Sequence, residues 1–224
     1  MTASHCYAYP HPAVTTDVVV FTIREERLQL LLIRRRNPPY RGRWALPGGF
    51  VGIDEDLEEC AKRELAEETG IGDLFLEQLY TFGRPDRDPR ERVISVAYFG
   101  LAPCSRLRLK AASDASAAAW FPLDRLPELA FDHHEIIQLA HRRLVAKLHY
   151  STIAFQFMEP EFTLSELQAV YEILRGEPLD RRNFRKWVLS LDQIEETGEL
   201  RRNGNHRPAR TYRVRHPQRV AIIR

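Results

Sequence analysis

The chain has 224 residues, of which 44% are hydrophobic and 29% charged, and its formal net charge is only +2. That length allows one large domain or two modest ones. No apolar run approaches the roughly 20 residues of a membrane span, which excludes a protein held by a membrane-spanning helix. We expect no secretory signal in the first 12 residues, and the three cysteines are too far apart to predict a metal cluster or a disulfide set. A reducing cytoplasm is the expected location.

The small net charge conceals an uneven distribution. Residues 1–159 hold 20 Lys and Arg against 22 Asp and Glu, whereas residues 160–224 hold 13 against 9. Within the second segment, residues 181–224 contain 12 basic and 4 acidic side chains. A basic segment on a nearly neutral chain predicts an anionic partner for that segment alone.

The first part of the chain predicts an α/β unit. Two β-rich runs, 17–23 and 28–33, flank a polar turn and predict a hairpin of buried strands. A short strand near 44–46 is broken by Pro47-Gly48-Gly49. Asp54 or Asp56 can cap a helix at about 54–69, which Gly70 can end. Further strands are expected at 74–82 and 92–101, and another strand ends near residue 123. A final helix is expected at 134–148.

The last part predicts a helix-turn-helix with a wing. Thr163 and Glu166 form a capping-box pattern before a helix that Gly176 can end. Asp180 can cap a second helix, and strand-like runs at 199–202 and 210–214 predict a hairpin. We therefore divide the chain into a first domain at 1–150, a linker at 151–159 and a winged helix at 160–224.

Acidic side chains gather on one face of the helix expected at 54–69. Glu64, Glu67 and Glu68 stand at i, i+3 and i+4, and Glu55 lies about two turns earlier. Packed like charges lower stability, whereas Mg²⁺ or Mn²⁺ binds carboxylate oxygens and completes its coordination with waters and substrate phosphates. The pattern predicts a divalent-metal site. The alternative is a solvated acidic face, which is the commoner use of acidic residues on a helix.

The residues around these carboxylates favour the metal site. From Gly49 to Ile71, glycines stand near both ends, Arg63 adjoins the carboxylates and an apolar stripe lies opposite. This segment resembles the box of the Nudix hydrolase family, with every defined position filled. The resemblance implies an α/β fold with a mixed sheet between helices, and cleavage of a diphosphate that is linked to another moiety.

The resemblance also implies roles for individual residues. Glu64, Glu67 and Glu68 would be catalytic metal ligands, and Glu55 an outer or water-mediated ligand. Arg63 would orient a glutamate, and Gly48 with Gly49 would let the backbone approach the metal. The metal would neutralise pyrophosphate oxygens and lower the pKa of the attacking water. The general base stays open, because families that share the box take it from the box or from a later loop, and the later candidates are Asp86, Asp88, Glu91, Glu128, Asp132 and Glu135.

Segments outside the box, at 34–44, 81–90, 95–98 and 129–133, resemble ADP-ribose-directed Nudix proteins. They are especially similar to the Nudix-related transcriptional regulators of NAD metabolism, in which a winged helix follows the Nudix domain. Arg84, Glu91 and Ala117 depart from that pattern. Guanidinium groups fit oxyanions in a forked geometry, although each arginine can equally be a solvated loop charge. The expected ligand-binding residues are Arg34, Arg35, Trp44, Arg84, Arg87 and Arg90.

The basic segment fits a DNA-reading winged helix. Its second helix would enter the major groove, where Arg and Asn side chains pair with base edges, and its wing would meet phosphate or the minor groove. The expected contacts are Arg181, Arg182, Asn183, Arg185 and Lys186 on the helix, and Arg201, Arg202, Arg207 and Arg210 on the wing. The alternative is a dimerisation or substrate-specificity module with a solvated basic face.

Two functions follow from the sequence. In the first, a homodimeric regulator binds a double-stranded DNA operator, and its Nudix domain binds and hydrolyses ADP-ribose or a related nucleotide. In the second, the chain is a metal-dependent pyrophosphatase of ADP-ribose or of a nucleoside-diphosphate sugar, with an accessory domain that does not bind DNA. The complete carboxylate pattern favours hydrolysis, and the basic segment favours DNA binding.

Overall fold

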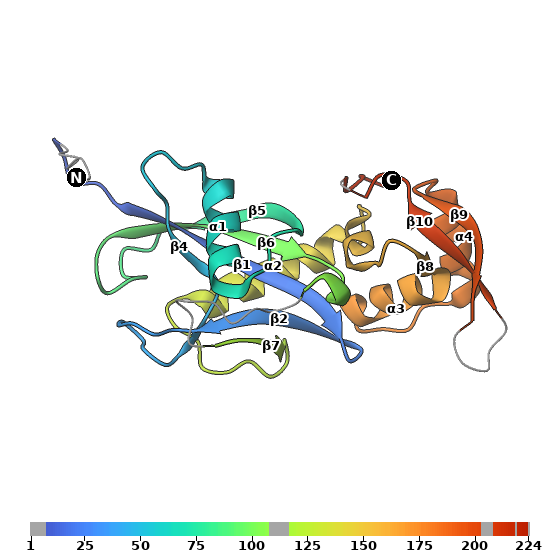
Figure 1. The fold of residues 1–224 in the computed structure, drawn as a ribbon, viewed down its shortest axis with the longest axis horizontal. Coiled ribbons are helices and arrows are strands. Elements are labelled where there is room, and N and C mark those ends of the chain that lie inside the picture. Colours follow the sequence, from blue (N-terminus) through green and yellow to red (C-terminus); the bar gives the residue numbers. More distant parts are fainter. Residues whose placement is uncertain (1–7, 108–116, 203–207, 218, 224) are drawn as a thin grey trace.

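The computed structural model describes residues 8–107, 117–202, 208–217 and 219–223. Figure 1 shows an elongated molecule in which two units lie side by side. The first contains β1 to β7 with α1 and α2, and the second contains β8 to β10 with α3 and α4. None of the helices in the described ranges is long and apolar enough to cross a membrane.

A mixed sheet forms the centre of the first unit. β1 (Ala13–Arg24) pairs antiparallel with β2 (Arg27–Arg34) and parallel with β6 (Val93–Leu101). The expected hairpin is therefore confirmed, with β1 extended back to Ala13. The remaining strands are β3 (Trp44–Ala45) and β7 (Ala118–Pro122) on β2, β4 (Gly48–Phe50) on β1, and β5 (Phe75–Phe82) on β6.

Helices cover both faces of this sheet, α1 (Leu57–Thr69) on one and α2 (His133–Lys147) on the other. The alternation of side chains along β1 explains the layers. Val20 belongs to the same buried apolar cluster as Leu65 of α1, whereas Val19 belongs to the cluster that contains Ile136 of α2. Because both faces are covered, β1 carries a nearly continuous apolar run.

The helix that carries the carboxylates begins slightly later than the sequence predicts. Asp56, not Asp54, caps it, and its side chain accepts a hydrogen bond from the Glu58 backbone N–H at 2.9 Å. The expected end at Gly70 is confirmed, because Gly70 adopts the left-handed conformation with φ of 76°. Glycine adopts this conformation without steric cost.

The second unit is a winged helix. It consists of β8 (Phe162–Thr163), α3 (Leu164–Arg175), α4 (Arg181–Ser190), β9 (Ile194–Arg201) and β10 (Ala209–Val214). The capping box at Thr163 and Glu166 is present in full, and Asp180 caps α4. β9 starts earlier than the expected run at 199–202, and residues 203–207 between the two strands of the expected hairpin lie outside the described residues.

One apolar core runs through both units. The segment expected as a linker contains a short 3₁₀ helix, η2 (Ile153–Phe157), whose Phe155 and Phe157 are buried in the same cluster as Val19 of the sheet and Tyr171 of α3. The chain after β10 returns to this junction, where the Thr152 N–H donates to the carbonyl of Ala221 at 2.9 Å. The two units are therefore held together by packing as well as by the covalent chain.

Candidate active site and nucleic-acid interface

Gly48 and Gly49 begin β4 directly after the bend at Pro47, and this bend with its two glycines, called the glycine turn below, lies against both β1 and α1. A Cβ atom on Gly48 would lie 2.1 Å from the backbone oxygen of Thr16, and one on Gly49 would lie 2.3 Å from Oε1 of Glu64. At Gly48 the neighbour is backbone, so only glycine fits there, whereas a side chain at Gly49 would have to displace the Glu64 carboxylate. Glu68 approaches the same turn, and its Oε2 accepts a hydrogen bond from the Gly48 N–H at 2.9 Å. Two of the four predicted carboxylates, Glu64 and Glu68, therefore flank the turn.

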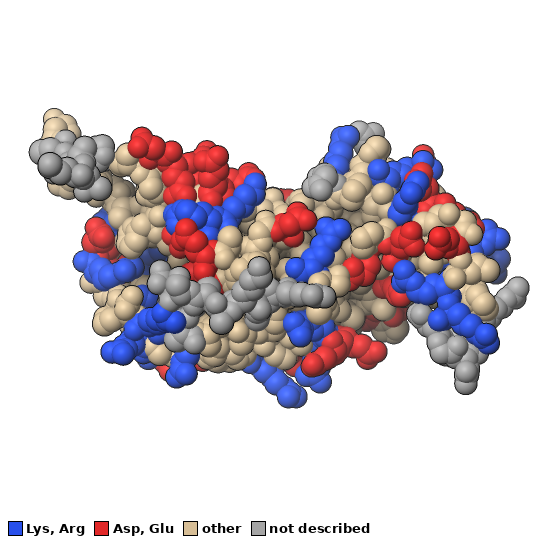
Figure 2. All heavy atoms as spheres, viewed as in Figure 1, with Lys and Arg blue, Asp and Glu red and all other residues tan. Residues whose placement is uncertain are grey.

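Arg63 holds the other two predicted carboxylates, Glu55 and Glu67. Its Nε and Nη2 donate to the two oxygens of Glu55 at 2.6 and 2.9 Å, and its Nη1 donates to Glu64 at 2.8 Å and to Glu67 at 3.2 Å. The Arg63 hydrogen bonds lower the pKa of Glu55 to about 2. Figure 2 shows this arrangement as acidic side chains gathered over α1 with basic groups among them. Arg63 thus fixes the orientation of three carboxylates.

Glu68 differs from the other carboxylates because it is largely removed from water. Burial raises its pKa to about 8, and the nearby charges of Glu64 and Asp17 act in the same direction, against the hydrogen bond from Gly48. A cation in contact with this carboxylate would favour its charged form and oppose the effect of burial.

The donor groups suit Mg²⁺ or Mn²⁺ without forming a closed cage. Within the described ranges, no group of three or more Asp, Glu, His or Cys side chains is arranged so that it could hold an ion. Mg²⁺ does not require such a cage, because it usually takes one or two carboxylates, several waters and substrate phosphates. Glu64 and Glu68 beside the glycine turn meet that requirement.

A cleft of about 180 Å³ lies beside the same turn. Two arginines and two aromatic rings give it both charge and flat apolar surface. The Arg35 guanidinium lies 4.7 Å from the centre of the Phe131 ring, and that of Arg90 lies 5.2 Å from the centre of the Phe50 ring. The residues that line the cleft are Thr15, Asp17, Ile33, Arg35, Leu46, Gly48, Gly49, Phe50, Asp88, Arg90, Phe131 and His133.

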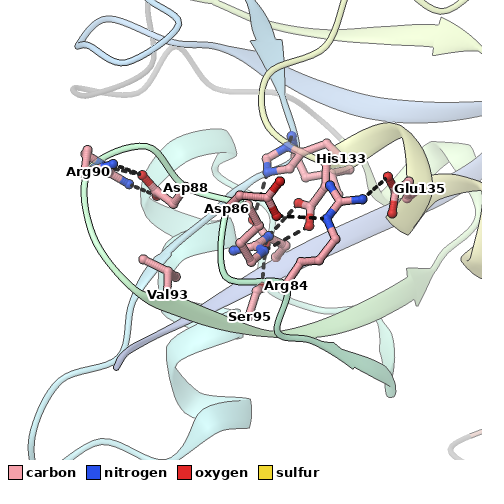
Figure 3. Close-up of polar contacts among 12 residues, drawn as sticks. Arg84, Asp86, Asp88, Arg90, Val93, Ser95, His133 and Glu135 are labelled. Atoms are coloured by element: carbon pink, nitrogen blue, oxygen red, sulfur yellow. Dashed lines mark hydrogen bonds and ion pairs between the residues drawn. The ribbon is translucent and has the colours of Figure 1, made fainter. Parts of the chain in front are cut away.

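Of the six residues expected to bind ligand, only Arg35 and Arg90 line this cleft. Arg34 is exposed and donates to the carbonyl of Gly42, and Trp44 packs edge-to-face on Phe121. Arg84 lies outside on the surface, where it pairs with Glu135 at 3.0 Å (Figure 3). The structure does not bring these three side chains to the cleft.

Arg87 also differs from the expectation. Only 4% of its side chain is exposed, and its guanidinium binds both oxygens of Asp132, at 3.0 and 2.7 Å, and Asp17 at 3.3 Å. Arg87 therefore has an internal role in the structure and is not available as a direct ligand contact.

The candidates for the general base are now distinguished by position. Asp88 lines the cleft, where it is paired with Arg90 at 2.7 Å (Figure 3). Asp132 is buried against Arg87, Glu128 pairs with Arg43, and Glu135 pairs with Arg84. Asp86 and Glu91 are exposed. Asp88 is the one of the six that borders the cleft.

Sequence reasoning missed several residues of the cleft. Asp17 and Phe50 were not singled out, although a carboxylate that interrupts the apolar run of β1 is itself a signal of a functional or buried polar network. Ser95, on β6, donates to Asp17 at 2.5 Å. His133 is buried, and its Nδ1 accepts a hydrogen bond from the Leu46 N–H at 2.8 Å.

The surface of α4 fits an anionic partner. Phe184 and Val188 are buried against the winged-helix core, which leaves the polar side of the helix in solvent. No ion pair involves that polar side within the described residues. The exposed residues are Arg181, Arg182, Asn183, Arg185 and Lys186.

The wing carries charge of both signs. Arg201 pairs with Glu166 at 3.2 Å and Arg210 pairs with Glu196 at 2.9 Å, while Arg202 is exposed. Arg207 lies outside the described residues. Figure 2 shows the result, with acidic and basic side chains interleaved over this unit. Among the described residues of this unit, α4 therefore carries most of the exposed positive charge that has no acidic partner, and Arg202 adds to it.

Comparison with known proteins agrees with this architecture. The NUDIX domain family matches residues 13–140, which is more than half of the chain. The chain belongs to the NUDIX family. The NrtR DNA-binding winged helix domain matches residues 154–214, so this NUDIX protein is of the NrtR type. The expected family and its two-part fold are confirmed.

Full-length relatives share both parts. The chain is 39% identical, over 92% of its length and 83% of the relative, to the ADPR responsive transcriptional repressor NtrR of Acinetobacter baylyi. The crystal structure of Shewanella oneidensis NrtR complexed with a 27mer DNA superposes with a TM-score of 0.82 at 37% identity, covering 92% of this chain and 95% of that one. The NUDIX part alone is similar to an ADP-ribose pyrophosphatase of Methanocaldococcus jannaschii, at 44% identity over 58% of this chain and 73% of that protein.

Proposed function

We propose that this NrtR-type NUDIX protein is a DNA-binding transcriptional regulator that responds to ADP-ribose, which its NUDIX domain binds and hydrolyses. The observation that carries the proposal is the exposed basic face of α4 in a chain that matches a repressor and a DNA-bound structure over 92% of its length. A NUDIX enzyme that needs only its cleft has no use for such a face.

The cleft has the chemistry that a nucleoside diphosphate requires. Arg35 and Arg90 supply fixed positive charge for the diphosphate, and Phe50 and Phe131 supply flat surfaces on which a base or ribose can pack. The glycine turn forms one wall, so a diphosphate in the cleft would lie beside the carboxylates of α1.

Hydrolysis is assigned to the same wall. Glu64 and Glu68 would hold Mg²⁺ or Mn²⁺, which when bound neutralises pyrophosphate oxygens and lowers the pKa of a coordinated water. Arg63 keeps Glu64 in place by a hydrogen bond and also binds Glu55 and Glu67, which would be further ligands or water-mediated ligands of the metal. Asp88 is the carboxylate best placed to accept a proton, and its pairing with Arg90 links that step to ligand binding.

DNA recognition is assigned to α4. Its arginines and Asn183 have the donors that pair with base edges in the major groove, and its basic charge provides the salt-dependent part of the affinity. We further propose a homodimer, because two copies would read two half-sites of an operator. A DNA-binding regulator acts in the compartment that holds the DNA, so we place the protein in the cytoplasm.

A gel-shift titration tests the proposal. DNA from upstream of the protein's own gene is titrated with the protein, with and without ADP-ribose, in Mg²⁺ and in EDTA. We expect salt-sensitive binding to that DNA and a change in affinity when ADP-ribose is added. Release of AMP from ADP-ribose is followed in the same samples. AMP release without DNA binding would favour the alternative function, a pyrophosphatase whose winged helix does not bind DNA.

A further inference from the structure

A buried polar network lies beneath the cleft and joins five separate segments of the chain. Asp17 lies on β1 and Ser95 on β6, Arg87 belongs to the loop between β5 and β6, and Asp132 and His133 begin α2. His133 extends the network to the fifth segment, because its Nδ1 accepts the Leu46 N–H immediately before the glycine turn. Each of these segments also borders the cleft or adjoins a residue that does.

The hydrogen-bond directions fix the charge state of this network. A backbone N–H can only donate, so Nδ1 of His133 carries no proton, and its Nε2–H faces Asp17 Oδ1 at 3.4 Å. Burial lowers the pKa of His133, which agrees with a neutral ring. Two carboxylates, Asp17 and Asp132, therefore share the single positive charge of Arg87.

Arg87 lies in the middle of the loop that shapes one side of the cleft. Asp88, the next residue, and Arg90 both line the cleft, and Arg90 is held to Asp88 by three hydrogen bonds of 2.7 to 3.0 Å. Figure 3 shows the Asp88–Arg90 pair on one side of the buried network and the surface pair Arg84–Glu135 on the other. Arg87 provides a buried attachment of the loop between these two pairs.

We propose that Arg87 is a positioning residue for ligand binding: anchored by Asp132 and Asp17, it fixes the loop so that Arg90 lies over Phe50 and Phe131 in the cleft. This inference rests on the proposed binding of ADP-ribose and deepens it. The guanidinium is suited to this role because its planar fork binds both oxygens of Asp132 while reaching Asp17. A lysine could supply the charge but not the fork.

The test compares three variants in the full-length protein. Arg87→Met removes the anchor, Arg87→Lys keeps the charge, and Arg92→Met removes an exposed arginine whose hydrogen bonds go to the backbone oxygens of Arg84 and Val93. We expect Arg87→Met to weaken ADP-ribose binding by about tenfold or more, since misplacement by 1 Å can cost up to 100-fold. The affinity of Arg87→Lys for ADP-ribose should lie between those of Arg87→Met and wild type, and the affinity of Arg92→Met should equal that of wild type.

Two readouts separate positioning from general damage. KM for ADP-ribose should rise in Arg87→Met and stay at the wild-type value in Arg92→Met, and kcat should also fall in Arg87→Met because Asp88, the proposed proton acceptor, is the next residue of the same loop. Combining Arg87→Met with Arg90→Ala should add little to the effect of Arg90→Ala alone, because the two residues act through one contact. Additive losses, or equal KM values for Arg87→Met and wild type, would overturn the proposal.

Amide hydrogen exchange tests in the absence of ligand whether Arg87 anchors the loop. Residues 86–90 should exchange faster in Arg87→Met than in wild type or Arg92→Met, while α1 keeps its protection. If Arg87→Met does not fold, the same comparison is made with Arg87→Lys, and unchanged exchange and affinity in that variant overturn the proposal. Wild-type protein that binds no ADP-ribose would refute the proposed function, and the exchange rates would still establish or refute the anchor.

Discussion

Gly48 donates its backbone N–H to Oε2 of Glu68 at 2.9 Å, and this contact joins the turn after β3 to the helix that carries the carboxylates. The neighbouring Gly49 is so close to Glu64 that any side chain there would displace the Glu64 carboxylate. Backbone and carboxylates therefore form one wall of the cleft. The local sequence predicted both parts, a Gly-Gly break and an acidic helix, and the pairing of β4 with β1 places them together.

The two glycines should respond differently to substitution. Gly48→Ala sets a methyl group against the Thr16 backbone, which cannot move without disturbing β1, so we expect a loss of about 1–3 kcal/mol in the free energy of unfolding. Gly49→Ala meets the Glu64 side chain, which can rotate away, so stability should change little while hydrolysis falls. Gly72→Ala is the control, because a Cβ there meets nothing within 4 Å. Urea denaturation and AMP release distinguish the three, and equal stability of Gly48→Ala and Gly72→Ala would contradict the close contact.

Glu68→Gln tests the carboxylate wall with little change of shape. The amide keeps an oxygen for the Gly48 N–H and removes a negative charge that burial disfavours, so the fold should be as stable as wild type or slightly more stable. Mg²⁺-dependent AMP release should fall at least about 100-fold, because charge stabilisation by a bound metal is worth several kcal/mol. Thermal unfolding checks the first expectation and a rate assay the second. An unchanged rate would remove Glu68 from the mechanism.

The limits of sequence reasoning are clearest in the loop between β5 and β6. Arg84, Arg87 and Arg90 are chemically alike and close together, and all three were expected to bind ligand. Their different positions depend on partners far along the chain: Arg87 binds Asp132 and Asp17, which are 45 and 70 residues away. By contrast, the caps and glycines that bound the helices act over a few residues, so helix ends were predicted closely.

DNA binding should depend on α4 more than on the wing. Arg182→Ala and Arg185→Ala each remove an exposed charge with no acidic partner among the described residues. Each should therefore weaken DNA binding by about 1–3 kcal/mol. Where the lost contact is to a phosphate, the slope of the logarithm of the binding constant against the logarithm of the salt concentration should decrease in magnitude by about 1. Arg213→Ala is the matched control, because Arg213 is paired with Glu195 at 2.6 Å. Binding is measured by fluorescence anisotropy across a salt series. A larger loss from Arg213→Ala than from the α4 variants would assign recognition to the wing.

Stability towards acid should depend on His133. Its folded-state pKa lies below the ordinary value of 6.5 because the ring is buried, so the unfolded chain takes up a proton first as the pH falls. The contribution of neutral His133 to the free energy of unfolding is therefore complete above pH 6.5 and is lost as the pH decreases towards the folded-state pKa, with a slope of up to about 1.4 kcal/mol per pH unit.

His133→Asn keeps an acceptor for the Leu46 N–H but does not titrate, so its stability should vary less with pH in this range. His134→Asn, at the exposed neighbouring position, is the control and should follow wild type. Parallel curves for His133→Asn and wild type, measured by urea denaturation from pH 7 to pH 5, would show that another group governs the acid sensitivity.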